Sequence, residues 1–202
     1  MKTLLIGILV IGLGFFSLVW FKGAPTPDTG VDVVGDYPAF TKGPSTAKVK
    51  ITEYADFQCP SCAFMAPAVA ELLAKYPNDI ELTFKHFPLT KIHARALLAA
   101  KASEAAGKQG KFFEMHNKLF TGQSTWSSNS KAEEIFVGYA TELGLNVDQF
   151  KIDLKNEEIA AKIRSNMAEG AKNDVQGTPT FFVNGLKVEN PSLVTSVEAA
   201  LK

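Results

Sequence analysis

The chain has 202 residues, and its 21 basic and 21 acidic side chains cancel, which argues against a nucleic-acid-binding surface because such a surface needs a clustered basic excess. Its two cysteines are too few for the disulfide framework of a small secreted scaffold. They also supply only half of a Cys₄ zinc site, and the histidines are too scattered to complete it: His86, His93 and His116. We therefore expect no metal and one folded domain with its own core.

The N-terminus carries an uncharged, apolar run, residues 3–21, flanked by Lys2 and Lys22. As a helix this run would extend about 28 Å, close to the thickness of the hydrocarbon core of a bilayer. A cleaved signal peptide is the alternative, but the positions where small residues normally precede the cut hold Phe21 or Lys22. We therefore predict an uncleaved N-terminal transmembrane signal-anchor over residues 1–22.

The next segments lead from this anchor into the folded domain, which we expect over residues 36–202. Residues 23–35 contain prolines, glycines and aspartates, a composition typical of a short flexible tether. An irregular lead-in with room for a short edge strand follows. Residues 48–57 then alternate, with Ile51 and Glu53 on one side, which predicts a central strand.

A helix is predicted from Pro60 to about Lys75, because proline suits the first helical turn, with a kink at Pro67. Residues 80–87 form a second predicted strand. Strand, helix and strand within about 40 residues make a βαβ unit, so a partly parallel sheet is expected.

The stretch over about residues 91–174 is rich in Ala, Glu, Lys and Leu and predicts four or five helices that form a compact cap. Strand signals return at residues 180–183 and 186–189, on either side of an Asn-Gly pair that is a strong hairpin signal. Residues 192–201 predict a closing helix. The expected fold class is therefore α/β, with two mixed halves separated by a helical insertion.

Both cysteines lie at the predicted strand-to-helix junction, Cys59 beside the helix start and Cys62 one turn later. The first N–H groups of a helix have no partner within it and carry the positive end of its dipole, so they favour a thiolate over a thiol. The thiolate is the reactive form of cysteine. We therefore predict a dithiol/disulfide redox site, with a static, buried cysteine pair as the alternative.

Two motifs resemble those of the DsbA family of the thioredoxin superfamily: Phe-Gln-Cys-Pro-Ser-Cys at residues 57–62 and Gly-Thr-Pro-Thr-Phe-Phe-Val-Asn-Gly at residues 177–185, with the helical insertion between them. The resemblance covers roughly residues 36–202. It implies a thioredoxin-like fold, in which a central mixed β-sheet is flanked by helices and carries the insertion, here preceded by one transmembrane helix. It also implies a protein disulfide oxidoreductase, an enzyme of thiol–disulfide exchange.

The resemblance implies roles for three catalytic residues. Cys59 is the nucleophile at the helix start, and Cys62 is the inward-facing resolving thiol. Glu53 lies six residues before Cys59, where the family carries a buried acid that relays protons to the inner thiol. A buried carboxyl has a raised pKa and can exchange protons near neutral pH. A glutamate at a solvated strand end is the alternative.

The substrate-binding residues that the resemblance implies are Pro60, Ser61, Thr178 and Pro179. Pro179 matches the cis-proline of the family, which lies opposite the dithiol, and the backbone of Thr178 would pair with an extended substrate segment. Ser61 stands where the strongest oxidants of the family have a histidine that stabilises the thiolate. We therefore expect a less oxidising couple. The three histidines of this chain are interpreted as structural or surface residues.

We predict an extracytoplasmic enzyme that exchanges disulfides with exported proteins as an oxidase, with the Cys59–Cys62 disulfide in place of a cofactor. The expected partners are unfolded or partly folded exported proteins and a membrane protein that reoxidises the dithiol, with no nucleic acid. Because disulfides persist outside the cytoplasm, we expect a single-pass protein of the cell membrane with its catalytic domain on the extracytoplasmic side. The alternatives are a reductase or isomerase on the same scaffold, or a non-catalytic peptide-binding or chaperone-like envelope module.

Overall fold

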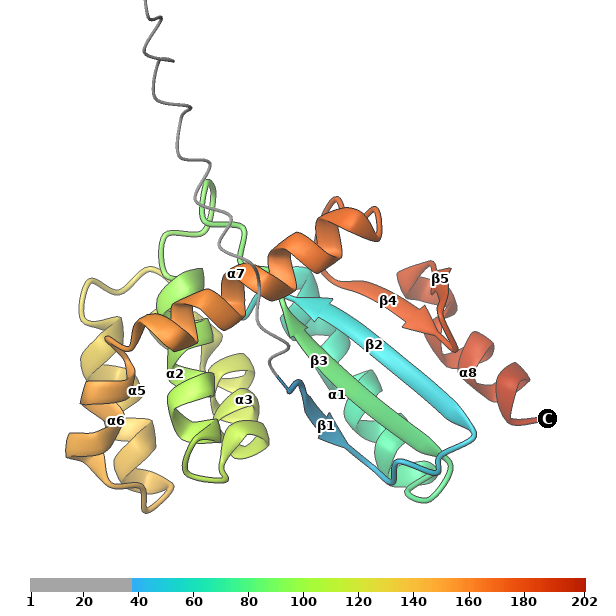
Figure 1. Ribbon diagram of the computed structural model, residues 1–202, viewed down its shortest axis with the longest axis horizontal. Helices are drawn as coiled ribbons and strands as arrows, with labels where there is room; N and C mark the ends of the chain where they lie inside the picture. The colour runs from blue at the N-terminus through green and yellow to red at the C-terminus, as the bar shows by residue number, and fades with distance from the viewer. Residues whose placement is uncertain (1–37) are drawn as a thin grey trace, which may run out of the picture. The chain divides into compact units, whose positions relative to one another are not determined.

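The computed structural model describes residues 38–202 (Figure 1). The predicted signal-anchor, residues 1–22, and the predicted tether, residues 23–35, lie outside the described residues. Among residues 38–202, no helix is long and apolar enough to cross a membrane.

A five-stranded sheet with the strand order β1-β3-β2-β4-β5 lies at the centre of the fold. Its strands are Phe40–Lys42 (β1), Val49–Ala55 (β2), Ile80–His86 (β3), Thr180–Val183 (β4) and Leu186–Val188 (β5). β2 and β3 run parallel, whereas every other neighbouring pair is antiparallel. The sheet is therefore mixed, as predicted, and β1 is the short edge strand for which the lead-in had room.

Helices cover both faces of this sheet (Figure 1). On one face, α1 (Pro60–Lys75) and α8 (Leu193–Leu201) share a core with the inward side chains of the strands, including Ile51. On the other face lies α7 (Glu157–Lys172). The Tyr54 hydroxyl and the Lys85 ammonium, which point to that second face, donate to Glu169 of α7 at 3.0 and 2.8 Å.

The helical insertion connects β3 to β4 (Figure 1). Its helices are Ala96–Gly107 (α2), Phe112–Thr121 (α3), Gln123–Trp126 (α4), Ala132–Glu142 (α5), Val147–Asp153 (α6) and the long α7 that returns to the sheet. Six helices thus stand where four or five were expected. The difference is α4, a single turn of four residues, which is too short to leave a periodic signal in the sequence.

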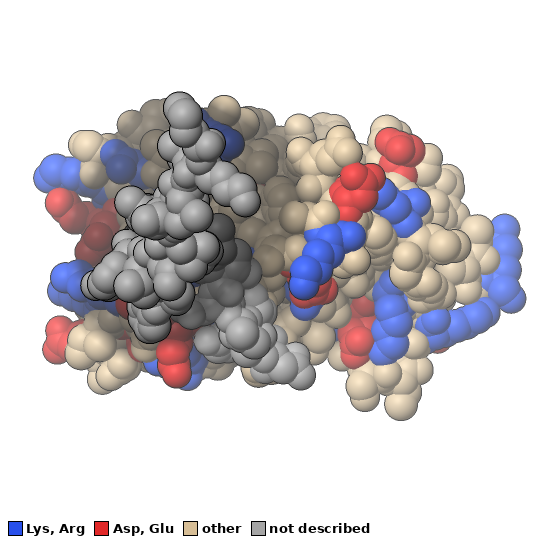
Figure 2. All heavy atoms as spheres, turned by 45° about the horizontal axis from the view of Figure 1, so that its top comes forward, with Lys and Arg blue, Asp and Glu red and all other residues tan. Residues whose placement is uncertain are grey.

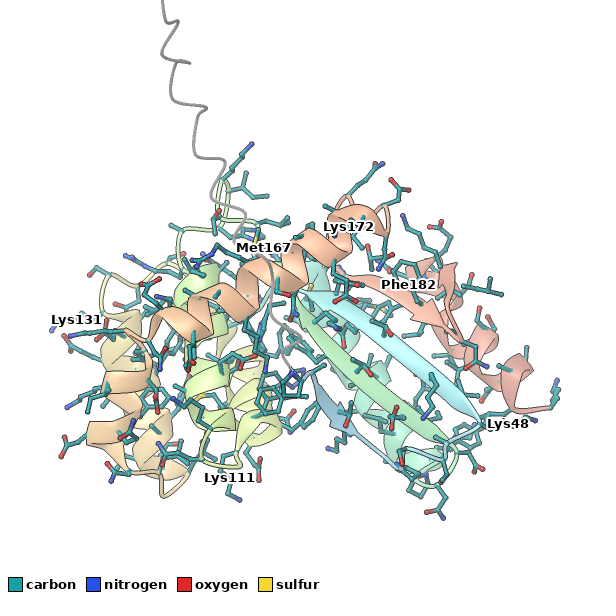
Figure 3. All side chains as sticks on the ribbon, viewed as in Figure 1. Lys48, Lys111, Lys131, Met167, Lys172 and Phe182 are labelled. Atoms are coloured by element: carbon teal, nitrogen blue, oxygen red, sulfur yellow. The ribbon has the colours of Figure 1, made fainter. Side chains whose placement is uncertain are left out.

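The larger of two core clusters joins the insertion to the sheet. It contains the fully buried Trp126, Phe136 and Phe150, and Met167 of α7, labelled in Figure 3, packs against it. The indole Nε1 of Trp126 donates to the carbonyl of Leu119 at 2.8 Å, so its one polar atom is satisfied. Because this core is continuous from the helices to the strands, the insertion is part of one domain with the sheet.

Several boundaries agree with the sequence pattern. β4 spans the predicted residues 180–183, and α1 begins at Pro60 and ends at Lys75. At the turn between β4 and β5, Asn184 and Gly185 have φ values of 48° and 82°, the left-handed conformation that a two-residue hairpin of this type requires. The chain between β3 and α2 is a longer loop than the pattern indicated, since α2 begins only at Ala96.

On the face shown in Figure 2, basic and acidic side chains are interspersed and neither sign forms a broad patch. This distribution matches the neutral formal charge of the chain.

Candidate active site

Cys59 lies at the N-cap of α1, directly after the loop that leaves β2. Its backbone is extended, with φ −72° and ψ 123°, and its N–H donates to the carbonyl of Asp56 at 3.0 Å. The helix starts at Pro60, whose missing N–H costs nothing in the first turn. Pro60 and Ser61 are exposed, whereas Cys59 is 7% exposed and Cys62 is fully buried. The two thiols are free.

The surroundings of Cys59 favour its thiolate. A hydrogen bond from the Cys62 side chain, with smaller contributions from Thr178 and from the N–H groups of Ser61 and Cys62, outweighs the opposing effect of burial and lowers the pKa of Cys59 from 9.0 to about 5. The donors sit at the start of α1, where helix N–H groups have no partner inside the helix. At neutral pH, Cys59 is therefore the ionised, reactive sulfur.

Cys62 has the opposite character. Burial, followed by the hydrogen bond to Cys59 and the charges of Cys59 and Glu53, raises the pKa of Cys62 far above its ordinary value. The N–H of Asp56 lies 3.5 Å from its Sγ, but this contact does not offset the loss of solvent. Cys62 is therefore a thiol that must lose its proton before it can attack a disulfide.

A second segment, far away in the sequence, lies against Cys59. The Thr178–Pro179 peptide bond is cis, as the resemblance implied. In its thiol form, Cys59 donates from Sγ to the carbonyl of Thr178 at 3.3 Å. The carbonyl of Thr178 is thus beside the reactive sulfur. The fold brings together the two motifs of the sequence.

Glu53 lies on β2 and is 1% exposed, so the expectation of a buried acid is correct and the solvated strand end is excluded. Its Oε1 has no hydrogen-bond partner. Burial raises the pKa of Glu53 from 4.5 to about 8. The carboxyl therefore holds its proton at neutral pH and can exchange it there.

Asp56 is a residue that sequence reasoning missed. Its buried carboxylate accepts from the N–H groups of Gln58 and Leu89 at 2.7 and 2.9 Å and bonds to Nδ1 of His93 at 2.6 Å. These contacts tie the loop before Cys59 to the loop that follows β3. An acidic residue within the aromatic run before the first cysteine was the available signal, because a charge there must be paired if it is buried.

Two glutamines, also missed, connect the active-site loop to the insertion. Gln123 of α4 donates from Nε2 to the carbonyls of Phe57 and Cys59 at 2.7 and 3.0 Å. Gln58 donates from its own Nε2 to the carbonyl of Ser127 at 2.8 Å. The insertion therefore binds the main chain on which the nucleophile sits. The sequence carries no signal for either contact beyond the position of Gln58 next to Cys59.

The remaining histidines have structural surroundings, as interpreted from the sequence. His86 is buried and bonds from Nε2 to Glu104, and His116 is enclosed by phenylalanine rings that include Phe57 and Phe120. Burial lowers the pKa of His116 from 6.5 to about 4, so it is neutral at physiological pH. Within residues 38–202, no three Cys, His, Asp or Glu side chains are grouped as metal ligands would be.

A family model described as thioredoxin matches residues 38–202. Among solved structures, a thioredoxin-like oxidoreductase from Silicibacter pomeroyi is 28% identical over 81% of this chain and 92% of its own, with a TM-score of 0.67. BdbD from Bacillus subtilis (23% identical, TM-score 0.70, 81% of this chain and 92% of its own) and α-DsbA1 from Wolbachia pipientis (21% identical, TM-score 0.71, 83% and 93%) share the fold.

The curated relatives are much longer proteins, and this chain matches only a part of each. The Na⁺/H⁺ antiporter NhaA 3 of Salinispora tropica is 38% identical over 79% of this chain and 24% of its own length. The Na⁺/H⁺ antiporter NhaA 1 of a Mycobacterium species is 32% identical over 96% of this chain and 33% of its own. The chain thus spans about a quarter to a third of the curated relatives it matches.

These relatives correct the predicted localisation. In them, a segment like this chain belongs to a much longer ion antiporter, a type of membrane protein. A single-pass protein of the cell membrane with an extracytoplasmic catalytic domain, as predicted from residues 3–21, is therefore wrong. The prediction combined one local apolar run with the persistence of disulfides outside the cytoplasm, and neither shows how a domain is attached to the rest of a protein.

The mixed sheet and the helices that cover it agree with the family match and with the solved folds. The chain belongs to the thioredoxin family.

Proposed function

We propose that this chain is a protein thiol–disulfide oxidoreductase that oxidises cysteine pairs in exported proteins. The observation that carries the proposal is the unequal pair of thiols at the start of α1. Cys59 has a low pKa and lies beside the Thr178 carbonyl, whereas Cys62 is buried and keeps its proton. A static cysteine pair would not need this difference, but an exchange cycle does, because one sulfur must leave easily and the other must stay inside.

In the oxidising direction, a substrate thiolate attacks Sγ of Cys59 in the Cys59–Cys62 disulfide. The bond between the two cysteines breaks, and Cys62 leaves as a thiolate that takes up a proton. The second substrate thiolate then attacks the substrate sulfur of the mixed disulfide, and Cys59 leaves as the thiolate. The substrate loses two electrons and gains a disulfide, while the enzyme dithiol is reduced. The low pKa of Cys59 makes it a good leaving group in the last step.

Residues around the two thiols also have roles in this cycle. Glu53 holds a proton at neutral pH and exchanges it with the buried Cys62 sulfur, and the charge of its ionised form raises the pKa of Cys62. The main chain at Thr178 binds an extended substrate segment beside Cys59, because its carbonyl faces the sulfur and backbone pairing is indifferent to substrate side chains. Recognition through backbone suits an enzyme that acts on many unfolded proteins, and Pro60 and Ser61 offer exposed surface next to the sulfur.

The direction of exchange depends on how far the fold stabilises the reduced pair. The thiolate of Cys59 stabilises it, which favours oxidation of substrates, whereas Ser61 contributes only a neutral hydroxyl. Repeated oxidation also requires a partner that removes two electrons from the dithiol, and we assign this role to a membrane protein. A reductase or isomerase is the second candidate, favoured by the absence of a cation at Ser61.

The reduction potential of residues 36–202 separates these directions. Equilibration with glutathione buffers should give a value at or above that of protein disulfide isomerase, about −180 mV. A value near that of thioredoxin, about −270 mV, would contradict the oxidase and support the reductase.

A trapping experiment tests exchange itself against a non-catalytic peptide-binding module. With Cys62→Ala, the mixed disulfide at Cys59 cannot resolve, so adducts with exported proteins that a reductant releases should accumulate. The matched control is Cys59→Ala, which keeps one cysteine but removes the reactive sulfur and should trap nothing. Equal trapping by both variants, or none by Cys62→Ala while Cys59 can still be alkylated, would refute exchange at this site.

A further inference from the structure

The position of Cys62 raises the question of how its proton reaches solvent. Cys62 and Glu53 are both fully enclosed, and Cys59 lies on the solvent side of Cys62. When a substrate is joined to Cys59, that side is covered by the substrate itself. A proton that Cys62 gains or loses at this stage must therefore travel away from Cys59, through the interior of the protein.

Glu53 and His86 lie on the same face of neighbouring strands. In the parallel pairing of β2 with β3, Glu53 is opposite Phe84 and Ala55 is opposite His86. Side chains two residues apart on a strand share a face, so His86 is the diagonal neighbour of Glu53. Glu53 Oε1 and His86 Nδ1 are both buried and have no hydrogen-bond partner. Because neither atom bonds to the other, a proton passes between them only through a bridging water molecule.

From His86, a continuous chain of polar atoms leads outward. His86 Nε2 is 3.0 Å from Oε1 of Glu104 on α2, and the other oxygen of Glu104 is 2.9 Å from the ammonium of Lys162 on α7. Exposure rises along this chain: Glu53 and His86 are 1% exposed, Glu104 is 3% exposed, and the Lys162 side chain is 11% exposed. The ring of Phe57 packs beside His86, with 6.0 Å between the two ring centroids.

This series of polar side chains ends at a cavity of about 410 Å³ between β1, α2 and α7. Glu104 and Lys162 both line this cavity, and the ring of Phe40 lies under the Lys162 ammonium at 4.1 Å. The other charged side chains at its wall are Lys108, which pairs with Asp153 at 2.6 Å, and Glu158. Water in this cavity can therefore contact the carboxylate of Glu104.

We propose that His86, Glu104 and Lys162 form a proton-transfer path between Glu53 and this cavity, through which Cys62 exchanges its proton with solvent during disulfide exchange. The inference rests on the proposed function, because only an exchange cycle changes the protonation of Cys62. It assigns a role to three groups that are buried at a cost and that the roles of Cys59, Cys62 and Glu53 leave unexplained.

In the resolving step, Cys59 is joined to the substrate by a mixed disulfide and Cys62 is a thiol. Cys62 gives its proton to the ionised form of Glu53 and attacks Sγ of Cys59, so the internal disulfide forms and the substrate sulfur leaves as a thiolate. Glu53 passes the proton through a bridging water to Nδ1 of His86 as Nε2–H of His86 releases one to Glu104, which delivers it to water in the cavity. Lys162 keeps Glu104 ionised between transfers: although burial opposes it, the contacts with His86 and Lys162 lower the pKa of Glu104. The oxidising direction reverses these steps.

A two-phase reaction of the reduced full chain with the aromatic disulfide 5,5′-dithiobis(2-nitrobenzoate) tests the path. Attack by Cys59 releases the first nitrothiobenzoate and leaves a mixed disulfide, and attack by Cys62 releases the second. Glu104→Gln keeps the shape of the side chain but cannot carry a proton. It should slow the second phase about tenfold, flatten its pH dependence and enlarge its solvent deuterium isotope effect, with the first phase unchanged.

Lys162→Met, at the outer end of the path, is a second test variant in case Glu104→Gln does not fold, because methionine keeps an apolar stem on the Phe40 ring. It should slow the second phase by a smaller factor than Glu104→Gln. Lys108→Met is the matched control, because Lys108 lines the same cavity but pairs with Asp153 instead of Glu104. A second phase as fast as that of the wild-type protein at every pH in both path variants would overturn the path. If the wild-type protein shows no first phase, the proposed function is refuted instead. Failure of the path and failure of the function therefore give different results.

Discussion

The buried carboxyl of Glu53 leads to the most direct prediction, because it should make the stability of this protein depend on pH with a defined sign. In the folded protein its pKa is raised to about 8, whereas the unfolded chain has the ordinary value of 4.5. Between these values the folded state holds a proton that the unfolded state has lost. Stability contributed by the protonated form is therefore fully present below pH 4.5 and is lost as the pH rises toward 8.

The size of the effect follows from the width of this window. Each pH unit above 4.5 lowers the free energy of unfolding by about 1.4 kcal/mol. At pH 7 the carboxyl of Glu53 therefore destabilises the fold by about 3 kcal/mol relative to acid pH. Glu53→Gln removes the titrating group and keeps the shape of the side chain. Relative to the wild-type protein, the variant should therefore gain about 3 kcal/mol of unfolding free energy between pH 4.5 and pH 7.

Urea unfolding of the reduced proteins at the two pH values measures this gain as a double difference, from which groups common to both proteins cancel. Glu133→Gln, at an exposed position of α5, is the control and should show no such change. If Glu53→Gln differs from the wild-type protein by the same amount at both pH values, the raised pKa of Glu53 and the proton-carrying role built on it are both refuted.

Three further predictions concern the neighbourhood of the thiols. Iodoacetamide should alkylate reduced Cys59 with a rate that rises through about pH 5 and levels off above it, while Cys62 stays unreactive. Mass spectrometry of the labelled peptide distinguishes the two cysteines, and equal labelling would contradict their assigned roles. Ser61→His should place a cation beside the thiolate and raise the reduction potential by about 30 mV or more, equivalent to about 1.4 kcal/mol, measured against glutathione, and an unchanged potential would show that residue 61 does not act on the sulfur. Asp56→Ala leaves the donors of Gln58, Leu89 and His93 without their acceptor. It should lower the free energy of unfolding, measured in urea titrations, by about 2–4 kcal/mol. A loss below about 0.5 kcal/mol would mean that water replaces these bonds.

The sequence by itself determined the local elements around the redox site. The alternation that predicted β2, the proline at the start of α1 and the Asn-Gly turn before β5 are signals contained within a few residues, and each element appears at its predicted place within a few residues. The position of Cys59 at a helix start is likewise a local fact, and so is the burial of Glu53 on the apolar side of its strand. Such features follow from backbone geometry and side-chain periodicity, which act over short distances along the chain.

The tertiary structure decided which distant groups meet. Cys59 and the Thr178 carbonyl are 119 residues apart in the sequence, and Asp56 and His93 are 37 residues apart. The contact of Gln123 with the active-site loop depends on α4, a turn too short to be seen as a pattern. Hydrogen bonds between buried polar groups leave no periodicity, since they depend on where strands and helices cross. Only the packing of the insertion against the sheet could therefore show that four segments meet at the redox site: the loop before α1, the loop after β3, α4 and the Thr178–Pro179 segment.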